Sequence, residues 1–353
     1  MADTRTPYHN LRDQKNTLRL REILSGLPGF AKDYFRAISN TSSTNTRISY
    51  AYDIRVFFQF LINENPLYKG KEITDFTLDI LDQIQPIDIE EYMDYLKLYQ
   101  DQKENITTNG ERGLKRKISA LRSFYSYYFK KQMIQTNPSL LIDMPKMHDK
   151  VIVRLEADEI AKLLDYIENC GEKLSGQKKV YYEKTKHRDL AIVTLLLGTG
   201  IRVSECVGLD LEDIDFNNNG IKVFRKGGNE MVVYFGEEVK KVLLDYLEER
   251  KNIQPLTGHE HALFYSTQRK RIGVQAIENL VKKYASQVTS TKKITPHKLR
   301  SSYGTQLYQE TGDIYLVADV LGHKDVNTTK KHYAAIDENR RKLAAKAVKL
   351  REE

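Results

Sequence analysis

The chain has 353 residues and a formal net charge of +8, and its length is sufficient for two ordinary domains with separate hydrophobic cores. Hydrophobic residues make up 40 % and charged residues 29 %. The longest uncharged apolar run, around residues 191–197, is far too short to span a bilayer, and the N-terminal stretch has no apolar core like that of a signal peptide. These values exclude an integral membrane protein and predict a cytoplasmic one. The excess of positive charge favours a polyanionic partner.

The cysteines also argue against a metal centre. Cys170 and Cys206 are the two cysteines of the chain, and their spacing is typical of neither a metal site nor a redox pair. No CxxC or HExxH pattern occurs. We therefore expect neither a metal ion nor another cofactor.

The first half of the chain predicts helices almost throughout. Apolar residues recur every three or four positions over residues 44–65, and residues 86–100 form a shorter amphipathic segment. Residues 107–134 form a third, in which Glu111 is the one acid against seven basic residues: Arg112, Lys115, Arg116, Lys117, Arg122, Lys130 and Lys131. A solvated face usually mixes both signs, so this imbalance favours contact with phosphates.

Helical periodicity stops near Gln135. The following stretch contains Pro138 and Pro145 and has no helical period, which predicts an extended linker. We place a domain boundary within residues 146–153.

The second half predicts a mixture of helices and strands. Helices fit residues 156–169, 185–200 and 236–251, whereas residues 217–236 contain two short runs with strand character, joined by a turn at residues 225–230. From Val274 onward the pattern is helical again. This part should therefore be helical with a small antiparallel sheet.

Two glycines raise the question of a nucleotide-binding loop. Gly198 and Gly200 follow an apolar run, but Val203 stands where a dinucleotide-binding loop needs a third small residue. The preceding segment also fits a helix better than a strand. The glycines are better explained as a helix terminus, which argues against a nicotinamide-dependent oxidoreductase. No GxxxxGK[ST] loop indicates an NTP-driven enzyme.

Six residues in the second half follow one another in an informative order. Arg202 follows the glycine turn, and Lys226 lies in the hairpin turn. His297 and Arg300 begin and end the motif HKLR. His323 ends the motif LGH, and Tyr333 lies ten residues after it. In order and spacing they resemble the tyrosine recombinases, also called phage-integrase-type recombinases. The resemblance covers nearly the whole chain and is strongest to the Xer recombinases of the single-protein XerS type.

The resemblance implies a mainly α fold with a small antiparallel β-sheet, arranged as a two-domain C-shaped DNA clamp. Residues 1–147 would form the helical, SAM-like core-binding domain with an N-terminal extension, residues 148–153 the linker, and residues 154–353 the catalytic domain with a C-terminal subunit-exchange helix. On this basis Arg112, Lys115, Arg116, Lys117 and Arg122 become candidates for DNA contact. Lys298, between His297 and Arg300, is a further one.

The resemblance also implies the chemistry of the site. Arg202 and Arg300 would clamp the two non-bridging oxygens of a phosphodiester, because guanidinium is a planar, permanently charged fork. His323 would donate another hydrogen bond to that phosphate. Glu205, three residues after Arg202, would orient the site.

The remaining roles concern bond breaking. Tyr333 would attack the scissile phosphate and form a 3′-phosphotyrosyl link, with His297 as phosphate ligand and general base. Lys226 would protonate the departing 5′-oxygen. Three other tyrosines lie nearby, and we expect them to belong to the buried stripes of their helices: Tyr303, Tyr308 and Tyr315.

The implied partners are a double-stranded DNA recombination site, a second copy on that site and a homotetramer in synapsis, with the FtsK translocase as a possible further partner. A nucleoid-associated location without a membrane follows. Three alternatives stay open: an integrase or excisionase of a mobile element, a type IB topoisomerase, and a DNA-binding protein without activity.

Overall fold

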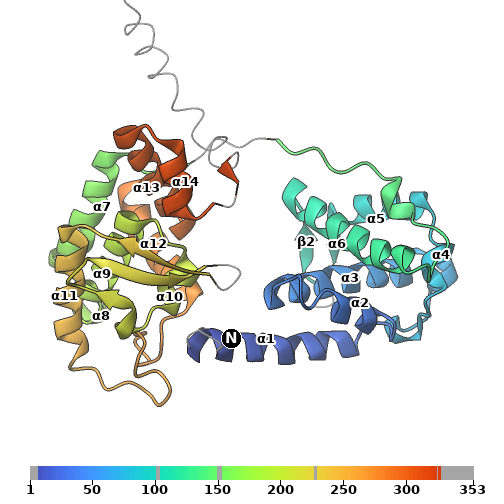
Figure 1. Ribbon diagram of the computed structural model, residues 1–353, viewed down its shortest axis with the longest axis horizontal. Coiled ribbons are helices and arrows are strands. Elements are labelled where there is room, and N and C mark those ends of the chain that lie inside the picture. Colours follow the sequence, from blue (N-terminus) through green and yellow to red (C-terminus); the bar gives the residue numbers. More distant parts are fainter. Residues whose placement is uncertain (1–6, 101–103, 149–152, 226–228, 324, 327–353) are drawn as a thin grey trace, which may run out of the picture. The chain divides into compact units, whose positions relative to one another are not determined.

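The computed structural model describes residues 7–100, 104–148, 153–225, 229–323 and 325–326. The chain divides into two compact units, Met1–Lys150 and Val151–Glu353. The first unit is almost entirely helical, and the second combines helices with a three-stranded antiparallel sheet (Figure 1). The expected fold class, mainly α with a small antiparallel sheet, is confirmed. None of the helices in the described ranges has the length and apolar character needed to cross a membrane.

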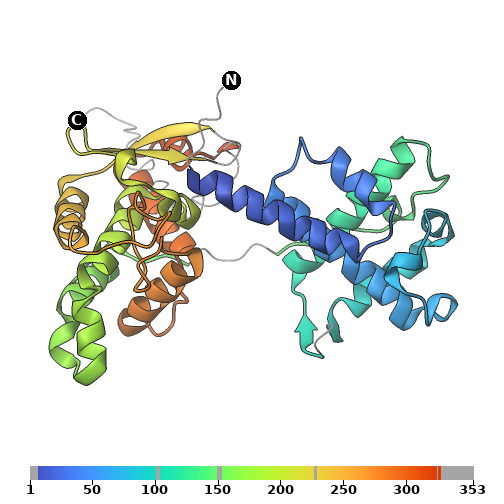
Figure 2. The same ribbon diagram turned by 90° about the horizontal axis from the view of Figure 1, so that it is seen from below.

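The first unit is built around the long helix α3. In the described part of this unit the helices are α1 (Pro7–Ser25), α2 (Ala31–Ala37), α3 (Thr44–Glu64), α4 (Ile80–Gln83), α5 (Pro86–Tyr95) and α6 (Glu111–Lys130). Short 3₁₀ turns are η1 (Pro66–Tyr68), η2 (Ile73–Asp75) and η3 (Pro138–Leu140). Helix α1 packs along α3 (Figure 2), so the described part of the N-terminal extension is helical.

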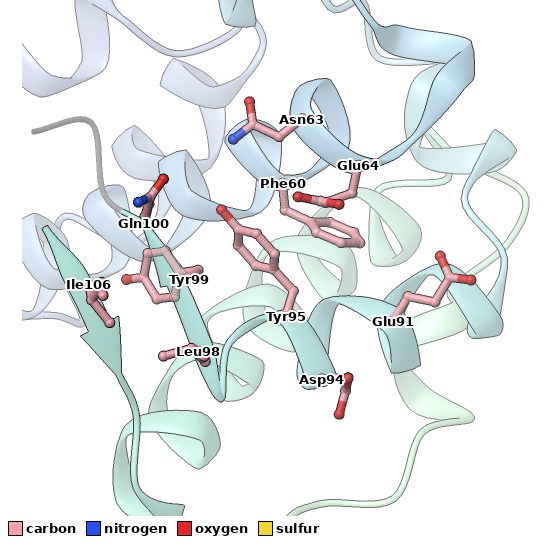
Figure 3. Close-up of a pocket in the computed structure, with 10 residues that line it drawn as sticks. All are labelled: Phe60, Asn63, Glu64, Glu91, Asp94, Tyr95, Leu98, Tyr99, Gln100 and Ile106. Atoms are coloured by element: carbon pink, nitrogen blue, oxygen red, sulfur yellow. The ribbon is translucent and has the colours of Figure 1, made fainter. Parts of the chain in front are cut away.

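A small hairpin interrupts the helices of this unit. Strand β1 (Leu98–Gln100) pairs antiparallel with β2 (Ile106–Thr108). The ring of Tyr99 stacks on that of Tyr95 at 5.2 Å between centroids, and both border a pocket of about 770 Å³ (Figure 3). The expectation of one amphipathic segment over residues 86–100 is therefore wrong beyond Tyr95.

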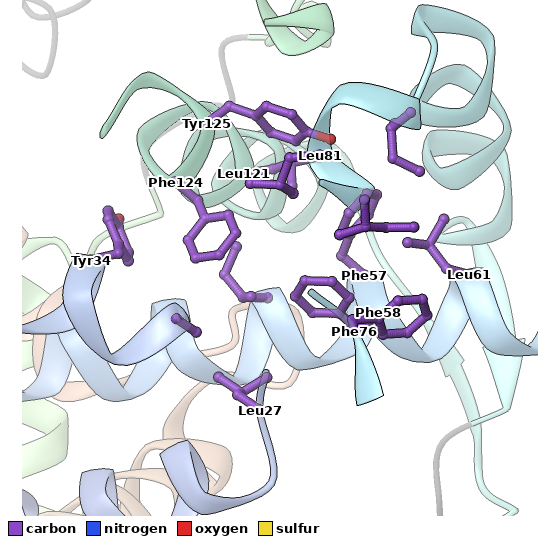
Figure 4. Close-up of a cluster of buried hydrophobic side chains, with 14 of the residues drawn as sticks. Leu27, Tyr34, Phe57, Phe58, Leu61, Phe76, Leu81, Leu121, Phe124 and Tyr125 are labelled. Carbon is purple, nitrogen blue, oxygen red and sulfur yellow. The ribbon is translucent and has the colours of Figure 1, made fainter. Parts of the chain in front are cut away.

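Aromatic side chains fill the core of the first unit. Phe58 of α3 faces Phe124 of α6 at 6.4 Å between ring centroids, and Tyr34 of α2 lies on the other side of Phe124 (Figure 4). Tyr34 meets Phe124 edge-to-face at 5.1 Å, the geometry that the ring quadrupoles favour. The helical period in α3 and α6 thus buries one stripe of each helix, and Arg112, Lys115 and Arg116 of α6 stay exposed.

The second unit surrounds one buried helix, α9. Its described helices are α7 (Ala157–Asn169), α8 (Gly176–Glu183), α9 (Lys186–Thr199), α10 (Val203–Gly208), α11 (Glu237–Arg250), α12 (Val274–Val288), α13 (Pro296–Thr311) and α14 (Ile314–Leu321), with 3₁₀ turns η4 (Cys170–Lys173) and η5 (Leu211–Asp213). The sheet has the order β3 (Ile214–Asp215), β4 (Gly220–Phe224), β5 (Glu230–Tyr234). Helix α9 packs against α7, α11, α12 and α13.

Burial of α9 determines where its two ends lie. At its beginning, Arg188 and Asp189 are buried together, with Nη2 of the arginine 2.6 Å from the carboxylate. Such a pair is tolerated inside a protein because each charge is hydrogen-bonded. The apolar residues that follow fix the helix in the core, so its C-terminal end has a defined position. That end is where the candidate site begins.

Candidate active site

The turn after α9 places the first arginine. Gly200 ends the helix in the left-handed conformation, with φ of 62°. A side chain there would be strained, and its Cβ would overlap the ring of Tyr303. The chain therefore turns sharply and puts Arg202 at the N-cap of α10. Gly200 acts as the helix terminus expected, but Gly198 lies inside α9, where a Cβ would collide with Val239 of α11.

Glu205 holds Arg202 from two sides. Its carboxylate, in a residue that is 5 % exposed, accepts the backbone N–H of Arg202 at 2.8 Å and the Nη1 donor at 2.8 Å. These bonds fix both the start of α10 and the direction of the guanidinium. The Arg202 side chain stays 37 % exposed, so it can present further N–H groups to a ligand.

Arg300 lies in the second turn of α13 and is 4 % exposed. Its Nη1 donates to the carbonyl of Gly200 at 2.5 Å, and its Nη2 donates to the carbonyl of Leu321. One guanidinium therefore connects the end of α9 with the end of α14. This arrangement brings Arg300 and Arg202 to the same place although they are far apart in the sequence.

The C-terminal end of α14 is the meeting point of the site. Gly322 ends this helix with φ of 61°, and its carbonyl accepts Nη2 of Arg202 at 3.4 Å. His323 follows, and its backbone N–H donates to Ala318 at 2.9 Å. The last carbonyls of a helix carry partial negative charge and attract cations. The helix end therefore gathers the arginines around His323.

A third arginine, Arg225, joins this cluster and was missed by the sequence reasoning. It is the last residue before the hairpin turn, and its guanidinium donates to the carbonyls of Asp319 at 3.2 Å and Val320 at 2.5 Å. Burial lowers the pKa of the Arg225 guanidinium. The negative charge of Glu205 opposes this change, and the positive charge of Arg202 adds to it. The sequence signal was a second basic residue directly before Lys226.

His297 and Lys298 lie in the first turn of α13, one turn before Arg300. His297 is exposed, Lys298 is half-buried, and the backbone carbonyl of His297 accepts the hydroxyl of Ser301 at 3.1 Å. The structure thus brings Arg202, Arg300 and His323 together around the end of α14. Lys226 and Tyr333 lie outside the described residues.

The three alternative tyrosines differ in their surroundings. Tyr308 is buried with Val317 and Leu321, and Tyr303 is half-buried, with its phenol pKa raised by burial. Tyr315 is 71 % exposed, so the expectation that it belongs to a buried stripe is wrong. It lies in the first turn of α14, where its side chain points away from the core.

The basic face of α6 contains residues that serve the fold. Lys117 is buried, with its Nζ 3.0 Å from Oδ1 of Asp53, and Arg116 pairs with the same carboxylate. Burial raises the pKa of Asp53, and the two cations oppose that rise. Arg122 donates to the carbonyl of Ser139 at 2.8 Å. Within the set predicted to contact DNA, Lys117 and Arg122 thus contribute to holding the unit together, whereas Arg112, Lys115 and, in part, Arg116 are exposed. That these residues contact DNA stays a prediction.

Because some basic residues of α6 are exposed and others are buried, substitutions on this one helix should have two different effects. The double variant Arg112→Ala/Lys115→Ala should weaken DNA binding and lower the salt slope by about two, because each phosphate contact contributes about one. Lys117→Ala should instead cost roughly 3 kcal/mol of stability, since it removes one partner of a buried charge. Filter binding at several salt concentrations and thermal unfolding separate the two effects. A large loss of stability in the double variant would contradict the division.

The pocket beside the β1–β2 hairpin has a different character. Aromatic side chains form part of its wall, and Glu64, Glu91 and Asp94 lie around them (Figure 3). Three carboxylates repel a phosphate backbone. The pocket is therefore not the candidate DNA-processing site.

The comparisons agree with the fold and the motifs. Residues 153–340 match the phage integrase family. Tyrosine recombinase XerC of Caldanaerobacter subterraneus subsp. tengcongensis is 30 % identical over 91 % of this chain and 86 % of the relative. Tyrosine recombinase XerS of Lactococcus lactis subsp. cremoris (strain MG1363) is 30 % identical over 93 % of this chain and 96 % of the relative.

Solved structures share the fold. The post-cleavage complex of the XerH site-specific recombinase with a palindromic difH substrate has a TM-score of 0.64 at 18 % identity and covers 98 % of this chain and 90 % of that one. A lambda integrase dimer bound to a COC′ core site has a TM-score of 0.58 at 18 % identity, covering 86 % and 93 %.

The mainly helical fold shared with these structures, and the buried helix that ends at an arginine cluster, agree with the class that the family match and the two relatives indicate, the tyrosine recombinases. The family match spans more than half of the chain, and the two relatives align with most of it. The chain belongs to the phage integrase family.

Proposed function

We propose that this chain is a site-specific recombinase of the Xer type, which cuts and rejoins double-stranded DNA through a 3′-phosphotyrosyl intermediate and a Holliday junction. The observation that carries the proposal is the convergence of Arg202 and Arg300 on the carbonyl end of α14, directly before His323. Separate segments of the chain build one positively charged site there. A phosphodiester is the anion that such a group of planar donors fits.

The arginines act on the phosphate in this proposal. When the phosphorus is attacked, negative charge grows on its two non-bridging oxygens, and donors already in place stabilise that charge without reorganising. Arg202 and Arg300 each donate to one oxygen, and His323 adds a further hydrogen bond. Glu205 keeps Arg202 in the required direction through its two bonds.

The proton transfers complete the reaction. His297 accepts the phenolic proton of Tyr333 while the phenolate oxygen forms its bond to phosphorus. The bond from phosphorus to the 5′-oxygen breaks, and the ammonium of Lys226 gives its proton to that oxygen. The phosphotyrosyl link retains the energy of the phosphodiester, so the reverse attack by a 5′-hydroxyl rejoins the strands without ATP.

The Xer assignment sets the biological role. The relatives named XerC and XerS align with most of this chain, which supports a role in resolving chromosome dimers at the nucleoid. We assign residues 1–147 to core binding, 148–153 to the linker and 154–353 to catalysis. The chain would act as a dimer on each site and a tetramer in synapsis, with FtsK as a partner in cells.

A suicide substrate tests the central claim. A candidate chromosomal site with a nick beside the scissile phosphate loses a short fragment after cleavage, which traps the covalent adduct. We expect a protein–DNA band that survives denaturation and disappears after proteolysis. DNA relaxation without strand exchange between two sites would instead indicate a topoisomerase, and recombination confined to the ends of a mobile element would indicate an integrase.

The C-terminal segment should act between subunits. Residues 337–353 lie outside the described residues, but their sequence is amphipathic through Leu343, Ala344, Ala347 and Leu350. Truncation after Asp337 should reduce synapsis much more than DNA binding, because the segment docks on a neighbouring copy. Gel-shift assays that resolve one-site and two-site complexes measure both quantities. An equal loss of both would show that the segment folds onto its own subunit.

A further inference from the structure

We propose that Arg225 is a positioning residue of the phosphate site, which fixes the C-terminal end of α14 and thereby His323, the second residue after this helix. The inference rests on the function proposed above, in which His323 donates a hydrogen bond to the scissile phosphate. It gives Arg225 a task different from that of Arg202 and Arg300, because Arg225 acts on the helix end and not on the phosphate.

Three arginines share the end of α14. Guanidinium groups donate to the carbonyls of the four consecutive residues 319–322. Arg225 donates to the first two, at 3.2 Å and 2.5 Å, whereas Arg300 donates to the third and Arg202 to the fourth. The last carbonyls of a helix lack the regular hydrogen bonds of its interior and carry partial negative charge, so cations stabilise them.

The three arginines differ in what else they bind. Arg202 is also bound by Glu205, and Arg300 also donates to the carbonyl of Gly200. Both Nη atoms of Arg225 instead donate to α14, and its backbone extends the pairing of β4 with β5 by one hydrogen bond. Arg225 therefore connects the sheet to the end of this helix.

Helix α14 is short and packs through a small apolar cluster. It has eight residues, too few for a helix that is stable by itself. Its Val317 and Leu321 are buried together with Tyr308 of α13. Hydrogen bonds from a charged donor are among the strong ones. Losing the two bonds from Arg225 should therefore let the end of α14 shift while the rest of the unit keeps its fold.

Gly322 lets the guanidinium approach the helix end closely. A Cβ at this position would overlap the guanidinium of Arg225, and the backbone φ of 61° is one that glycine adopts without strain. His323 is the next residue, and its backbone N–H donates to the carbonyl of Ala318 at 2.9 Å. A shift of this last turn must therefore displace His323 as well.

Arg225→Ala should slow cleavage, because it displaces one donor to the phosphate. A group misplaced by about 1 Å can slow a reaction about 100-fold, and the loss should not exceed that of His323→Ala. The double variant Arg225→Ala/His323→Ala should be about as slow as His323→Ala alone, since both substitutions act on the same donor. If the two effects instead multiply, Arg225 acts through another group and the inference is overturned.

The imidazole of His323 also reports the position of the helix end without DNA or catalysis. In NMR spectra of protein with isotopically labelled histidine, its signal is the one that disappears in His323→Ala. That signal should shift or broaden in Arg225→Ala and should change less in Arg225→Lys, which keeps a charged donor but cannot span two carbonyls. An unchanged signal in Arg225→Ala would overturn the inference.

Arg250→Ala is the matched control. Its guanidinium also donates to a backbone carbonyl of the second unit, that of Ala262 at 2.7 Å. It should lower thermal stability but leave the His323 signal and the cleavage rate unchanged. A shift of that signal as large as in Arg225→Ala would mean that it follows stability in general, which overturns the inference. If His323→Ala cleaves at the wild-type rate, the phosphate role proposed for His323 fails, and the NMR comparison alone decides whether Arg225 fixes the helix end.

Discussion

Tyr333→Phe should bind the recombination site with unchanged affinity and form no covalent adduct with it. The variant loses one oxygen, the atom that attacks phosphorus, and nothing else in the group of phosphate donors changes. Glu205 of α10 holds Arg202, and the carbonyls of Gly200 and Leu321 hold Arg300, and the substitution leaves these contacts in place. Gel shift measures binding, and denaturing electrophoresis with a suicide substrate measures the adduct.

Other tyrosines provide the controls for that experiment. Tyr315→Phe changes an exposed phenol on α14 and should leave adduct formation unchanged. Tyr303→Phe tests the half-buried phenol beside Gly200, whose pKa is raised by burial, which disfavours the phenolate needed for attack. An adduct that persists in Tyr333→Phe and disappears in Tyr303→Phe would identify Tyr303 as the nucleophile.

Periodicity predicted the large helices because burial repeats along them. In α3 and α6 the buried residues recur at helical spacing, and α9 is buried along nearly its whole length. The β1–β2 hairpin could not be predicted in this way. Its strands have three residues each, and Leu98 and Ile106 are exposed on both, so no alternation of buried and polar residues marks them.

The order of motifs predicted candidate residues for the site, of which the structure brings Arg202, Arg300 and His323 together, but it did not predict what holds them. Arg225 contacts carbonyls of residues 94 and 95 positions away, and the acceptors are backbone atoms, which carry no residue-specific signal. The same limit explains why the burial of Lys117 was not predicted. Its partner Asp53 lies 64 positions away on α3, so the composition of α6 alone could not separate a buried ion pair from a DNA-facing lysine. Polar contacts between residues far apart in the sequence could therefore be identified only from the structure.

Arg300→Lys should reduce cleavage about 10²–10³-fold while leaving the fold and DNA binding largely intact. Loss of one preorganised donor to a developing oxyanion has an effect of that size. Lysine keeps the charge, but it cannot span the carbonyls of Gly200 and Leu321 as the guanidinium does, so it cannot be aimed at the phosphate from a 4 % exposed position. Single-turnover cleavage of the suicide substrate measures the rate.

Arg271→Lys is the control for Arg300→Lys, because it separates a loss of catalysis from a loss of stability. Arg271 is also a largely buried arginine of the second unit, and its Nη1 donates to the carbonyls of Val207 at 3.1 Å and Leu209 at 2.8 Å. Both variants should lower the unfolding temperature by a similar amount, because each loses a buried fork of hydrogen bonds. At a temperature where both are folded, only Arg300→Lys should be slow. Equal cleavage rates in the two variants would mean that Arg300 supports the fold alone, and that the phosphate is held by Arg202 and His323 without it.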